Sequence, residues 1–519
     1  MREITIDNRI RVRIDDLSPD AVGQLMSDFT HRNPQRAKLE HLGIRGRALR
    51  KEPKVIETWR IADGWLTLPR GGLDRLRNVL DAFGVERRIV DARTQGDPSL
   101  AGKLPEHRLP DGQVLWDFQR QIVGEATRIE NCAIRSPTGS GKTTAALAFA
   151  AAVNLPTLVI VWTGGLLDQW VRRAKVELRL ADDDIGIIGG GTHRIRPLTI
   201  GMQQSLRKCV HTLVDTFGVV IPDELQRFAA GTFFDVIDAL PARYRVGFSA
   251  NEKRKDRKEF LIYDMFGDVA VDVSQASLIG RGIVHDVEIR VVPTEFDAPW
   301  YRDLMNRSKD DPATGPSYLV TRDRLLAFDR IAEEMGRDAA RCAIATRIVA
   351  EAVAAGEQIV LLSHRREHCR TLAADVSALG IECGLMLGGA DGEGEYEQAR
   401  MGIERGSLRC AAGTYQAIGT GIDLPSVGVG VCCLPLANSA DGRPFFAQVR
   451  GRFCRTSAAT GKAGAVLYYL NDPKVYGWKP LRNLRRWNQH VVVLENGSWV
   501  DARDVLKRID KEADDATAK

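Results

Sequence analysis

One eight-residue segment restricts the fold of this chain more than any other feature of the sequence. Residues 136–143 are Ser-Pro-Thr-Gly-Ser-Gly-Lys-Thr, between an apolar run at 131–135 and an alanine-rich stretch. Glycines let consecutive backbone N–H groups converge on a phosphate, and the N-terminus of a following helix favours negative charge. The usual pattern has glycine where Ser136 stands, so the motif deviates at one position. The segment therefore predicts a strand–loop–helix unit of a parallel α/β sheet, with a phosphate at the loop.

Short apolar runs alternate with amphipathic stretches in two separate series, which predicts two parallel sheets. The strands expected in the first series are 131–135, 157–163, 198–202, 219–222 and 244–249. Those expected in the second series are 358–363, 382–387, 408–413, 427–434 and 463–469. The fold class that follows is α/β, with two tandem parallel sheets, a charged helical insertion at 299–347 between them, and a small α+β domain at the N-terminus.

Two adjacent carboxylates follow the apolar run at 219–222. A phosphate loop of this kind requires a carboxylate at the end of another strand, and Asp223 is placed to hold Mg²⁺ through water together with the Thr143 hydroxyl. Glu224 is then predicted to polarise an attacking water as general base, while Lys142 reaches the β- and γ-phosphates. The four residues together predict hydrolysis of a nucleoside triphosphate.

A basic motif in the second series, Gln-Val-Arg-Gly-Arg-Phe-Cys-Arg at 448–455, has helical spacing. Gln448, Arg452 and Arg455 stand at i, i+4 and i+7 and therefore share one helical face. Two guanidiniums presented by a facing domain would stabilise negative charge on a transferred phosphate. A plain basic helix surface is the alternative interpretation.

Composition excludes several classes of protein. The chain has 519 residues, 44% hydrophobic and 27% charged, with no apolar run near the roughly 20 residues that a membrane span requires. Charges at the N-terminus argue against a signal peptide. Nine cysteines without any Cys-x-x-Cys pair argue against a disulfide framework or a cysteine zinc site, and favour a reducing compartment.

Positive charge is concentrated at two places. Residues 1–104 contain twenty Lys and Arg against fifteen Asp and Glu, so they carry an excess equal to the +5 of the whole chain. Within them, 32–54 has eight bases and two acids, which suits a phosphate backbone but also fits an ordinary solvated surface. A second cluster near the C-terminus either stacks on nucleobases or packs a terminal helix. Its members are Trp478, Lys479, Arg482, Arg485, Arg486 and Trp487.

In their order along the chain, these motifs resemble those of the superfamily-2 helicases, and most closely the branch of XPB and phage UvsW. Further segments that carry the resemblance are Gly189-Gly190-Gly191, Ser249-Ala250-Asn251 and Arg254-Lys255-Asp256. The chain departs from the family at Gln226, where relatives have histidine or aspartate, and at Asn251, where they have threonine. Both departures concern the coupling of hydrolysis to movement.

The resemblance implies ATP and Mg²⁺ as cofactors and DNA, gripped by its backbone, as partner. The nucleotide contacts it implies are Gln119, Ser136, Pro137, Thr138, Gly139, Ser140, Gly141, Lys142, Thr143, Thr144, Gly421, Asp423 and Gln448. The nucleic-acid contacts it implies are Arg70, Thr163, Gln203, Gln204, Ser205, Arg254 and Thr414. Catalysis falls to Lys142, Asp223, Glu224, Arg452 and Arg455, with Thr143 and Asp223 at the metal.

The resemblance also implies a domain organisation. We expect an accessory DNA-binding domain at 1–104, a RecA-like domain at 105–285 that binds ATP, and a linker with a thumb-like helical insertion at 286–347. A second RecA-like domain at 348–475 and a basic-aromatic tail at 476–519 complete the chain.

One motif points elsewhere. His364-Arg-Arg-Glu-His368 has the spacing of an inverted zincin pattern, in which two histidines on one helical face hold Zn²⁺. The motif directly follows a predicted strand, at the position of another helicase motif. We therefore expect no metal there.

The function expected from these features is an ATP-dependent DNA helicase or translocase. It would remodel or unwind duplex or branched DNA in replication, recombination or repair, in the cytoplasm of a bacterial or phage-infected cell. An RNA helicase, a translocation motor subunit of a restriction or defence complex, and a nucleotide-dependent scaffold are the alternatives. The sequence does not predict polarity, the preferred DNA structure or the oligomeric state.

Overall fold

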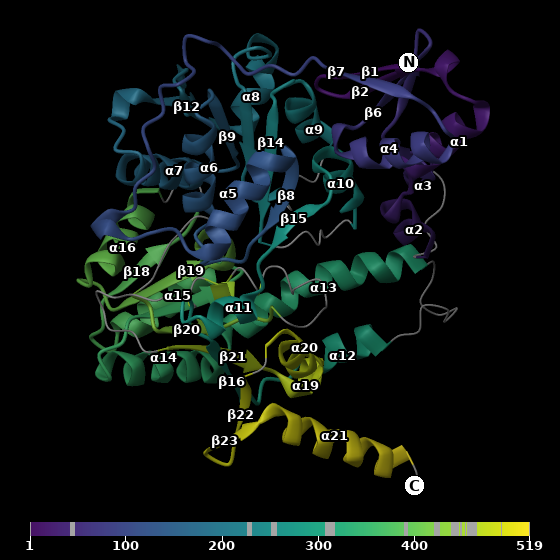
Figure 1. Cartoon of the computed structure of the whole chain (residues 1–519). Coiled ribbons are helices and arrows are strands. Elements are labelled where there is room, and N and C mark those ends of the chain that lie inside the picture. Colours follow the sequence, from purple (N-terminus) through teal and green to yellow (C-terminus); the bar gives the residue numbers. More distant parts are fainter. Residues whose placement is uncertain are drawn as a thin grey trace. The chain divides into compact units, whose positions relative to one another are not determined.

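The computed structural model contains two compact units, Met1–Gln275 and Ala276–Lys519 (Figure 1). The structure describes residues 2–517 except 42–46, 226–230, 251–256, 307–316, 389–392, 420–425, 437–445, 447–448, 452, 454–463 and 489. Among the described ranges, no helix combines the length and the apolar character needed to cross a membrane.

The first unit begins with a small α+β module. Its five-stranded sheet has the order β5-β6-β2-β1-β7, and its helices α1 and α4 enclose a core of alternate strand residues such as Ile4, Val12 and Leu66. A two-stranded ribbon with two short helices projects from this module. The bounds are β1 Arg2–Ile6, β2 Ile10–Arg13, α1 Pro19–Asp28, β3 Thr30–Arg32, α2 Pro34–His41, α3 Arg47–Arg50, β4 Val55–Glu57, β5 Arg60–Ala62, β6 Trp65–Leu68, α4 Leu73–Ala82 and β7 Arg87–Asp91.

An eight-stranded sheet of order β11-β10-β12-β9-β13-β14-β8-β15 forms the rest of the first unit. All of its pairs are parallel except β10–β11. Helix α6 is buried from Thr144 to Ala150, which explains why that stretch is rich in alanine rather than amphipathic. The bounds are α5 Asp117–Ile129, β8 Asn131–Arg135, α6 Lys142–Val153, β9 Thr157–Val161, α7 Gly164–Glu177, β10 Ile185–Gly189, β11 Thr192–Arg194, β12 Leu198–Met202, α8 Gln203–Cys209, β13 Val219–Pro222, α9 Gly231–Asp238, β14 Tyr244–Ser249, α10 Phe260–Phe266 and β15 Val269–Asp272.

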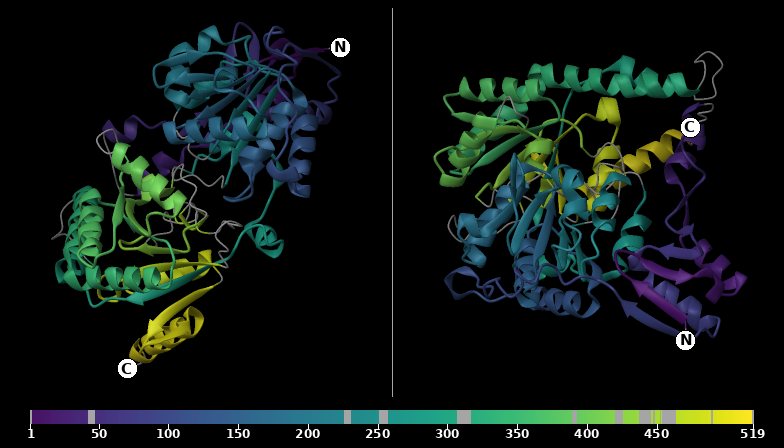
Figure 2. Two further views of the ribbon diagram at one scale, coloured as in Figure 1. Left: turned by 90° about the vertical axis from the view of Figure 1, so that its left-hand side faces the viewer. Right: turned by 90° about the horizontal axis from the view of Figure 1, so that it is seen from above.

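The second unit is built on another eight-stranded sheet, of order β18-β19-β17-β20-β21-β16-β22-β23. Its pairs are parallel except the β22–β23 hairpin, from which α21 extends (Figures 1 and 2). The bounds of its strands are β16 Val287–Pro293, β17 Ile359–Ser363, β18 Cys383–Met386, β19 Cys410–Thr414, β20 Val429–Cys432, β21 Ala465–Asn471, β22 Val491–Glu495 and β23 Ser498–Asp501. Its helices are α11 Gln275–Gly280, α12 Pro299–Asn306, α13 Ser317–Arg337, α14 Ala339–Ala354, α15 Arg366–Ser377, α16 Glu393–Arg405, α17 Tyr415–Gly419, α19 Pro473–Tyr476, α20 Lys479–Trp487 and α21 Ala502–Thr517.

The expected fold class is confirmed by these two mostly parallel sheets and the small N-terminal sheet. Two expected segments have a different place, however. Strand β16, expected in a linker, lies between β21 and β22 inside the second sheet. The expected tail is also part of that sheet, because it supplies β22 and β23. None of these three strands was foreseen, since each stands apart in sequence from the series it joins.

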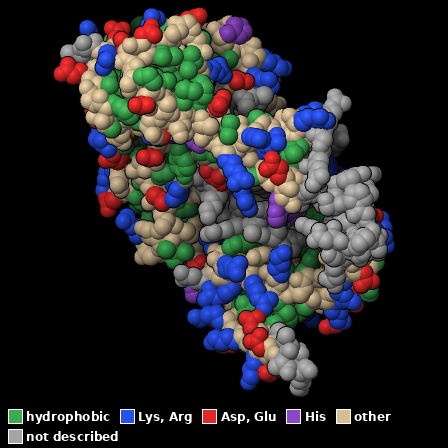
Figure 3. Space-filling view, turned by 90° about the vertical axis from the view of Figure 1, so that its right-hand side faces the viewer, with side chains coloured by type: hydrophobic (Ala, Val, Ile, Leu, Met, Phe, Trp, Pro, Cys, Tyr) green, Lys and Arg blue, Asp and Glu red, His purple; other side chains and the backbone are tan. Residues whose placement is uncertain are grey.

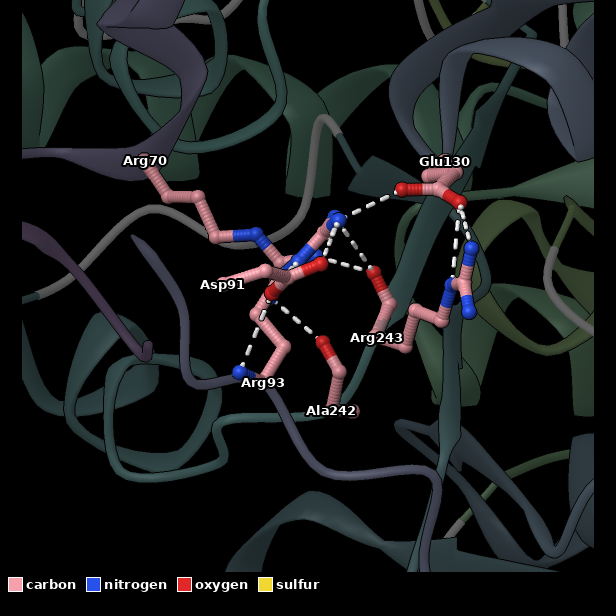
Figure 4. A network of polar contacts seen from close by, with 6 residues as sticks. All are labelled: Arg70, Asp91, Arg93, Glu130, Ala242 and Arg243. Atoms are coloured by element: carbon pink, nitrogen blue, oxygen red, sulfur yellow. Dashed lines mark hydrogen bonds and ion pairs between the residues drawn. The ribbon is translucent and has the colours of Figure 1, made fainter. Parts of the chain in front are cut away.

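The N-terminal module is fixed to the first large sheet by buried polar contacts (Figure 4). The guanidinium of Arg70 donates hydrogen bonds to the backbone carbonyls of Ala242 and Arg243. Arg93 adds an ion pair of 2.6 Å with Glu130, which also pairs with Arg243 at 2.7 Å. The module therefore belongs to the same compact unit as the sheet beside it.

A second contact of the module centres on a single buried carboxylate. Asp264 of α10 lies 2.8 Å from His31 Nε2 and 2.6 Å from both Thr58 Oγ1 and Arg75 Nη2. Burial raises the pKa of Asp264, but the hydrogen bonds from His31 and Thr58 and the charge of Arg75 outweigh it, so the pKa falls below its ordinary value. The carboxylate is therefore held charged and acts as an anchor for three separate segments of the module.

Candidate nucleotide site and nucleic-acid interface

The phosphate loop joins the carboxyl end of β8 to the N-terminus of α6. Gly139 and Gly141 have φ values of 89° and 72°, a left-handed conformation that side chains with a Cβ rarely adopt. Ser136 Oγ donates to Ser140 Oγ at 2.6 Å, and Ser140 Oγ donates to the carbonyl of Pro137 at 2.7 Å. The serine that replaces the usual first glycine is therefore used inside the loop, where it helps to hold the turn.

Gln119 braces the phosphate loop from helix α5. Its Nε2 donates to the carbonyl of Ser140 at 3.0 Å, and its Oε1 accepts from the backbone N–H of Trp116 at 3.0 Å. A Cβ on Gly141 would lie 2.5 Å from Gln119 Nε2, so this close approach also requires glycine. The side chain is 3% exposed. These contacts hold the loop, and a contact between Gln119 and adenine stays a prediction.

The predicted carboxylates follow β13, and Asp223 is buried. Strand β14 lies between β13 and β8, so the two strand ends are about 9.5 Å apart along the same edge. Trp170 Nε1 donates to Asp223 Oδ2 at 2.9 Å. Burial first, and then the charge of Glu224, raises the pKa of Asp223 to about 6, although Lys142 and Trp170 act in the opposite direction.

This environment fits a magnesium ion. A buried carboxylate with a raised pKa lacks compensating positive charge, and a hard divalent cation supplies that charge while accepting oxygen ligands. Thr143 opens α6, next to Lys142. Glu224 has φ of 62°, a strained conformation for a residue with a side chain, and such strain is concentrated at functional positions.

Four of the predicted nucleic-acid residues of the first unit lie at the same edge of the sheet. Thr163 follows β9 and caps α7 by accepting from the N–H of Leu166 at 3.3 Å. Gln203, Gln204 and Ser205 follow β12 and form the first turn of α8. Gln203 is 6% exposed, whereas Gln204 is exposed. Parallel strands bring all of these residues to the edge that carries the phosphate loop.

Arg70 was wrongly expected to contact nucleic acid. It is 2% exposed, and both terminal nitrogens donate to backbone carbonyls inside the first unit (Figure 4). Burial, followed by the nearby charges of Arg245 and Arg93, lowers its pKa well below the ordinary arginine value. The Pro-Arg-Gly-Gly turn therefore fastens the module to the sheet, and Gly71 allows the approach, because a Cβ there would lie 2.2 Å from the backbone nitrogen of Gly267.

In the second unit, Thr414 ends β19 and accepts from the N–H of Ala417 at 3.2 Å. The two histidines of the zincin-like motif have separate partners. His364 Nε2 lies 2.9 Å from the carbonyl of Pro435, and His368 Nδ1 lies 3.1 Å from Ser363 Oγ. Among the described residues, no group of three or more His, Cys, Asp or Glu side chains could hold a metal ion.

Several predicted residues lie outside the described residues. They are Asn251, Arg254, Gly421, Asp423, Gln448, Arg452 and Arg455, together with Gln226 of the carboxylate motif. Their roles stay predictions.

Two buried residues of α7 contact the nucleotide site but were not predicted. Trp170 reaches Asp223, and the carboxylate of Glu177 accepts from Thr144 Oγ1 at 3.0 Å. Glu177 carries no sequence signal, because a glutamate on a helix is ordinarily exposed. Trp170 stands seven residues after Thr163, which is expected to contact nucleic acid. Only the fold shows that its indole turns toward Asp223.

Parts of this chain are similar to known proteins. Residues 112–254 match the family model described as "Type III restriction enzyme, res subunit". Several similar curated proteins are named as helicases. The matched segment contains the glycine-rich loop at 136–143, both carboxylates and helix α7.

The similarities to curated proteins extend over different lengths of the chain. The chain is 31% identical over 191 residues to "Probable helicase D10" of Escherichia phage T5, covering 37% of this chain and 40% of the phage protein. It is 27% identical over 377 residues to "DNA 3'-5' helicase XPB" of Kineococcus radiotolerans, covering 70% of this chain and 61% of that protein. The matches thus span about half the length of these relatives. Among solved structures, phage T4 UvsW matches at 14% identity over 95% of this chain and 98% of that chain, with a TM-score of 0.41.

Proposed function

We propose that this chain is an ATP-dependent DNA helicase or translocase that remodels duplex or branched DNA. The observation that carries the proposal is the placement of buried Asp223 at the same sheet edge as the phosphate loop. Lys142 and the loop N–H groups would bind the phosphates of ATP, while Thr143 and Asp223 would hold Mg²⁺. The metal would neutralise the charge on the β- and γ-phosphates.

Glu224 is proposed as the residue that orients and deprotonates water. Its neighbouring position to Asp223 places it beside the metal ligand, and its left-handed backbone is of the kind retained at functional sites. Arg452 and Arg455 are proposed to stabilise phosphate charge during hydrolysis, and Gln448, Gly421 and Asp423 to contact the nucleotide. These assignments rest on the sequence motifs.

The nucleic-acid residues are proposed to grip the backbone rather than the bases. Thr163, Gln204 and Ser205 follow strand ends at the nucleotide edge of the first sheet, and we assign Thr414 and Arg254 the same kind of role. Hydroxyl and amide groups of this kind donate hydrogen bonds to phosphate oxygens without contacting the bases. Little sequence preference is therefore expected.

The N-terminal module is proposed to add a further DNA contact through its projecting ribbon. Arg32, Arg50, Lys51 and Lys54 are exposed there, in contrast to buried Arg70. A row of exposed bases binds phosphates with release of counterions. We expect replacement of Arg50, Lys51 and Lys54 by alanine to weaken DNA binding and to make that binding less sensitive to salt.

Two other functions deserve a test. An RNA helicase has the same site, and one similar protein, of Acanthamoeba polyphaga mimivirus, is called "Putative ATP-dependent RNA helicase L396". The restriction-subunit family model favours a motor that works within a larger complex.

The experiment that separates these functions is ATP hydrolysis and strand separation measured on single-stranded DNA, duplex DNA, forked DNA and RNA. We expect the greatest stimulation with duplex or forked DNA. Stimulation by RNA alone would replace the proposal with an RNA helicase, and stimulation by duplex DNA without strand separation would favour a translocation motor.

A further inference from the structure

Helix α7 touches the nucleotide site at two points and begins at a proposed nucleic-acid contact. It has 14 residues, Gly164–Glu177, and is therefore about 21 Å long. Thr163 caps its N-terminus at the carboxyl end of β9. Trp170 and Glu177 are seven residues apart and therefore share one face of the helix. One rigid element thus joins three positions of functional interest.

The first contact is made by Trp170 in the middle of the helix. Its indole is 1% exposed, and Nε1 donates to Asp223 Oδ2 at 2.9 Å. The contact lies inside the first unit, between two buried side chains. A displacement of Asp223 would therefore either break this hydrogen bond or move the indole and the helix with it.

The second contact is made by Glu177 at the end of the helix. Its side chain has no exposed surface and has three partners: Thr144 Oγ1 at 3.0 Å, Arg173 Nη1 at 3.0 Å and His107 Nε2 at 2.9 Å. Thr144 follows the proposed magnesium ligand Thr143 in the first turn of α6. A buried carboxylate that loses a partner is costly, so Glu177 holds the two helices together.

We infer that α7 transmits the state of the nucleotide site to the nucleic-acid grip at Thr163, with Trp170 and Glu177 as positioning residues. The inference rests on the proposed function. Asp223 and Thr144 belong to different parts of the nucleotide site, and both are tied to the same face of one helix. A change at either point shifts or tilts α7 as a body, because a helix of this length bends little. The turn that Thr163 caps then moves together with the helix.

Neither side chain needs to reach the reacting atoms for this role. A packing role alone would require the bulk of Trp170 but not its N–H, and would place an apolar side chain rather than a carboxylate at Glu177. Glu177→Gln keeps the shape of the side chain and removes its charge, whereas Trp170→Phe removes the indole N–H and also some bulk. Glu177→Gln therefore separates transmission from packing most directly.

The test compares Trp170→Phe and Glu177→Gln with wild-type protein in ATP hydrolysis, without DNA and over a range of forked-DNA concentrations. Val176→Ala serves as control, because Val176 lies on the same helix and is 52% exposed. We expect the ratio of DNA-stimulated to basal kcat to fall about fivefold in the first two variants, the effect of about one lost hydrogen bond. The DNA concentration for half-maximal stimulation should rise, while KM for ATP changes little. The control should retain the wild-type ratio.

An equal fall of basal and stimulated kcat, or an unchanged ratio in both folded variants, would overturn the inference while leaving the proposed function intact. Thermal unfolding of each variant checks folding, and Glu177→Gln decides the matter if Trp170→Phe does not fold. A wild-type protein that hydrolyses ATP without stimulation by any nucleic acid would instead contradict the proposed function and the inference together.

Discussion

Each of the two large sheets places a buried aspartate at the carboxyl end of a parallel strand, but the two carboxylates have opposite surroundings. Asp223 follows β13 in the first unit and has the neutral Trp170 as its side-chain donor. Asp472 follows β21 in the second unit, where it pairs with the buried guanidinium of Arg341 and accepts from Thr294 Oγ1. The pKa of Asp223 is raised, whereas Asp472 forms an ion pair with a residue of the chain itself, Arg341.

This difference shows how the same sheet topology serves two purposes. Arg341 also donates to the carbonyl of Cys433 at 2.6 Å and thereby joins α14 to the ends of β20 and β21. A buried ion pair of this kind closes the sheet edge without any ligand. At the first edge, the charge of Lys142 and the hydrogen bond from Trp170 do not offset the burial of Asp223, so a magnesium ion there would supply the missing positive charge. Figure 3 shows Lys and Arg side chains gathered at the lower end of the face that it draws, and α20 and α21 carry several such residues.

The largest effect is expected when Lys142 of the phosphate loop is removed. Lys142→Ala should lower kcat/KM for ATP by about 10³-fold, because a charged group aimed at the phosphates is lost from the site. The free energy of unfolding should change by less than about 1 kcal/mol. Steady-state hydrolysis together with urea unfolding measures both quantities. Hydrolysis at the wild-type rate would show that Lys142 is not needed to bind the phosphates of ATP.

The matching change in the second unit should affect stability instead. Arg341→Met leaves Asp472 buried without its cation, and we expect the free energy of unfolding to fall by about 3–5 kcal/mol. Replacing both residues, as Arg341→Met with Asp472→Leu, should recover most of the loss. The control is Arg347→Met on the same helix, whose side chain is 63% exposed and which should cost less than about 0.5 kcal/mol. Equal losses for Arg341 and Arg347 would show that the internal pair is not needed.

The second unit also contains a buried histidine, His368, that should make its stability depend on pH. Burial, and then the charges of Arg341 and Arg365, lowers the pKa of His368 from 6.5 to about 4. Between these values the unfolded chain binds a proton that the folded chain does not, so stability falls as the pH drops from 6.5 to 4. The loss should be on the order of 3 kcal/mol and should be absent in His368→Asn. Urea unfolding at pH 7, 5.5 and 4 tests this, and identical pH slopes in both proteins would contradict it.

The smallest effect should be a gain in stability at the first edge. A raised pKa means that the folded protein favours protonated Asp223, so stability falls as the pH rises from 3.8 to about 6 and stays lower above it. In magnesium-free buffer at pH 7.5, Asp223→Asn should therefore raise the free energy of unfolding by about 1 kcal/mol. A loss of similar size would place Asp223 with Asp472 as a structural residue.

The sequence predicted the first sheet and the phosphate loop well because both depend on local patterns. The strands at 131–135, 198–202, 219–222 and 244–249 have the predicted bounds. It failed where a residue's role depends on distant partners. Arg70 stands in a basic, glycine-rich turn that suits a phosphate, but Ala242 and Arg243 occupy its guanidinium.

The same limitation hid the other long-range features. Strands β16, β22 and β23 join the second sheet although they lie outside its sequence series. The roles of Glu177 and Trp170 depend on their hydrogen bonds with Thr144 and Asp223, which are 33 and 53 residues away. Polar groups of this kind have no periodicity, and only the packing of helices on the sheet determines which of them meet.

The carboxyl edge of the first sheet is proposed to hydrolyse ATP with Glu224 as general base. The most direct test is steady-state ATP hydrolysis by wild-type protein and Glu224→Gln, with magnesium and forked DNA, alongside binding of a fluorescent ATP analogue. We predict that the variant binds the analogue with wild-type affinity and hydrolyses ATP at least about 10²-fold more slowly. Hydrolysis by the variant at the wild-type rate would contradict the account.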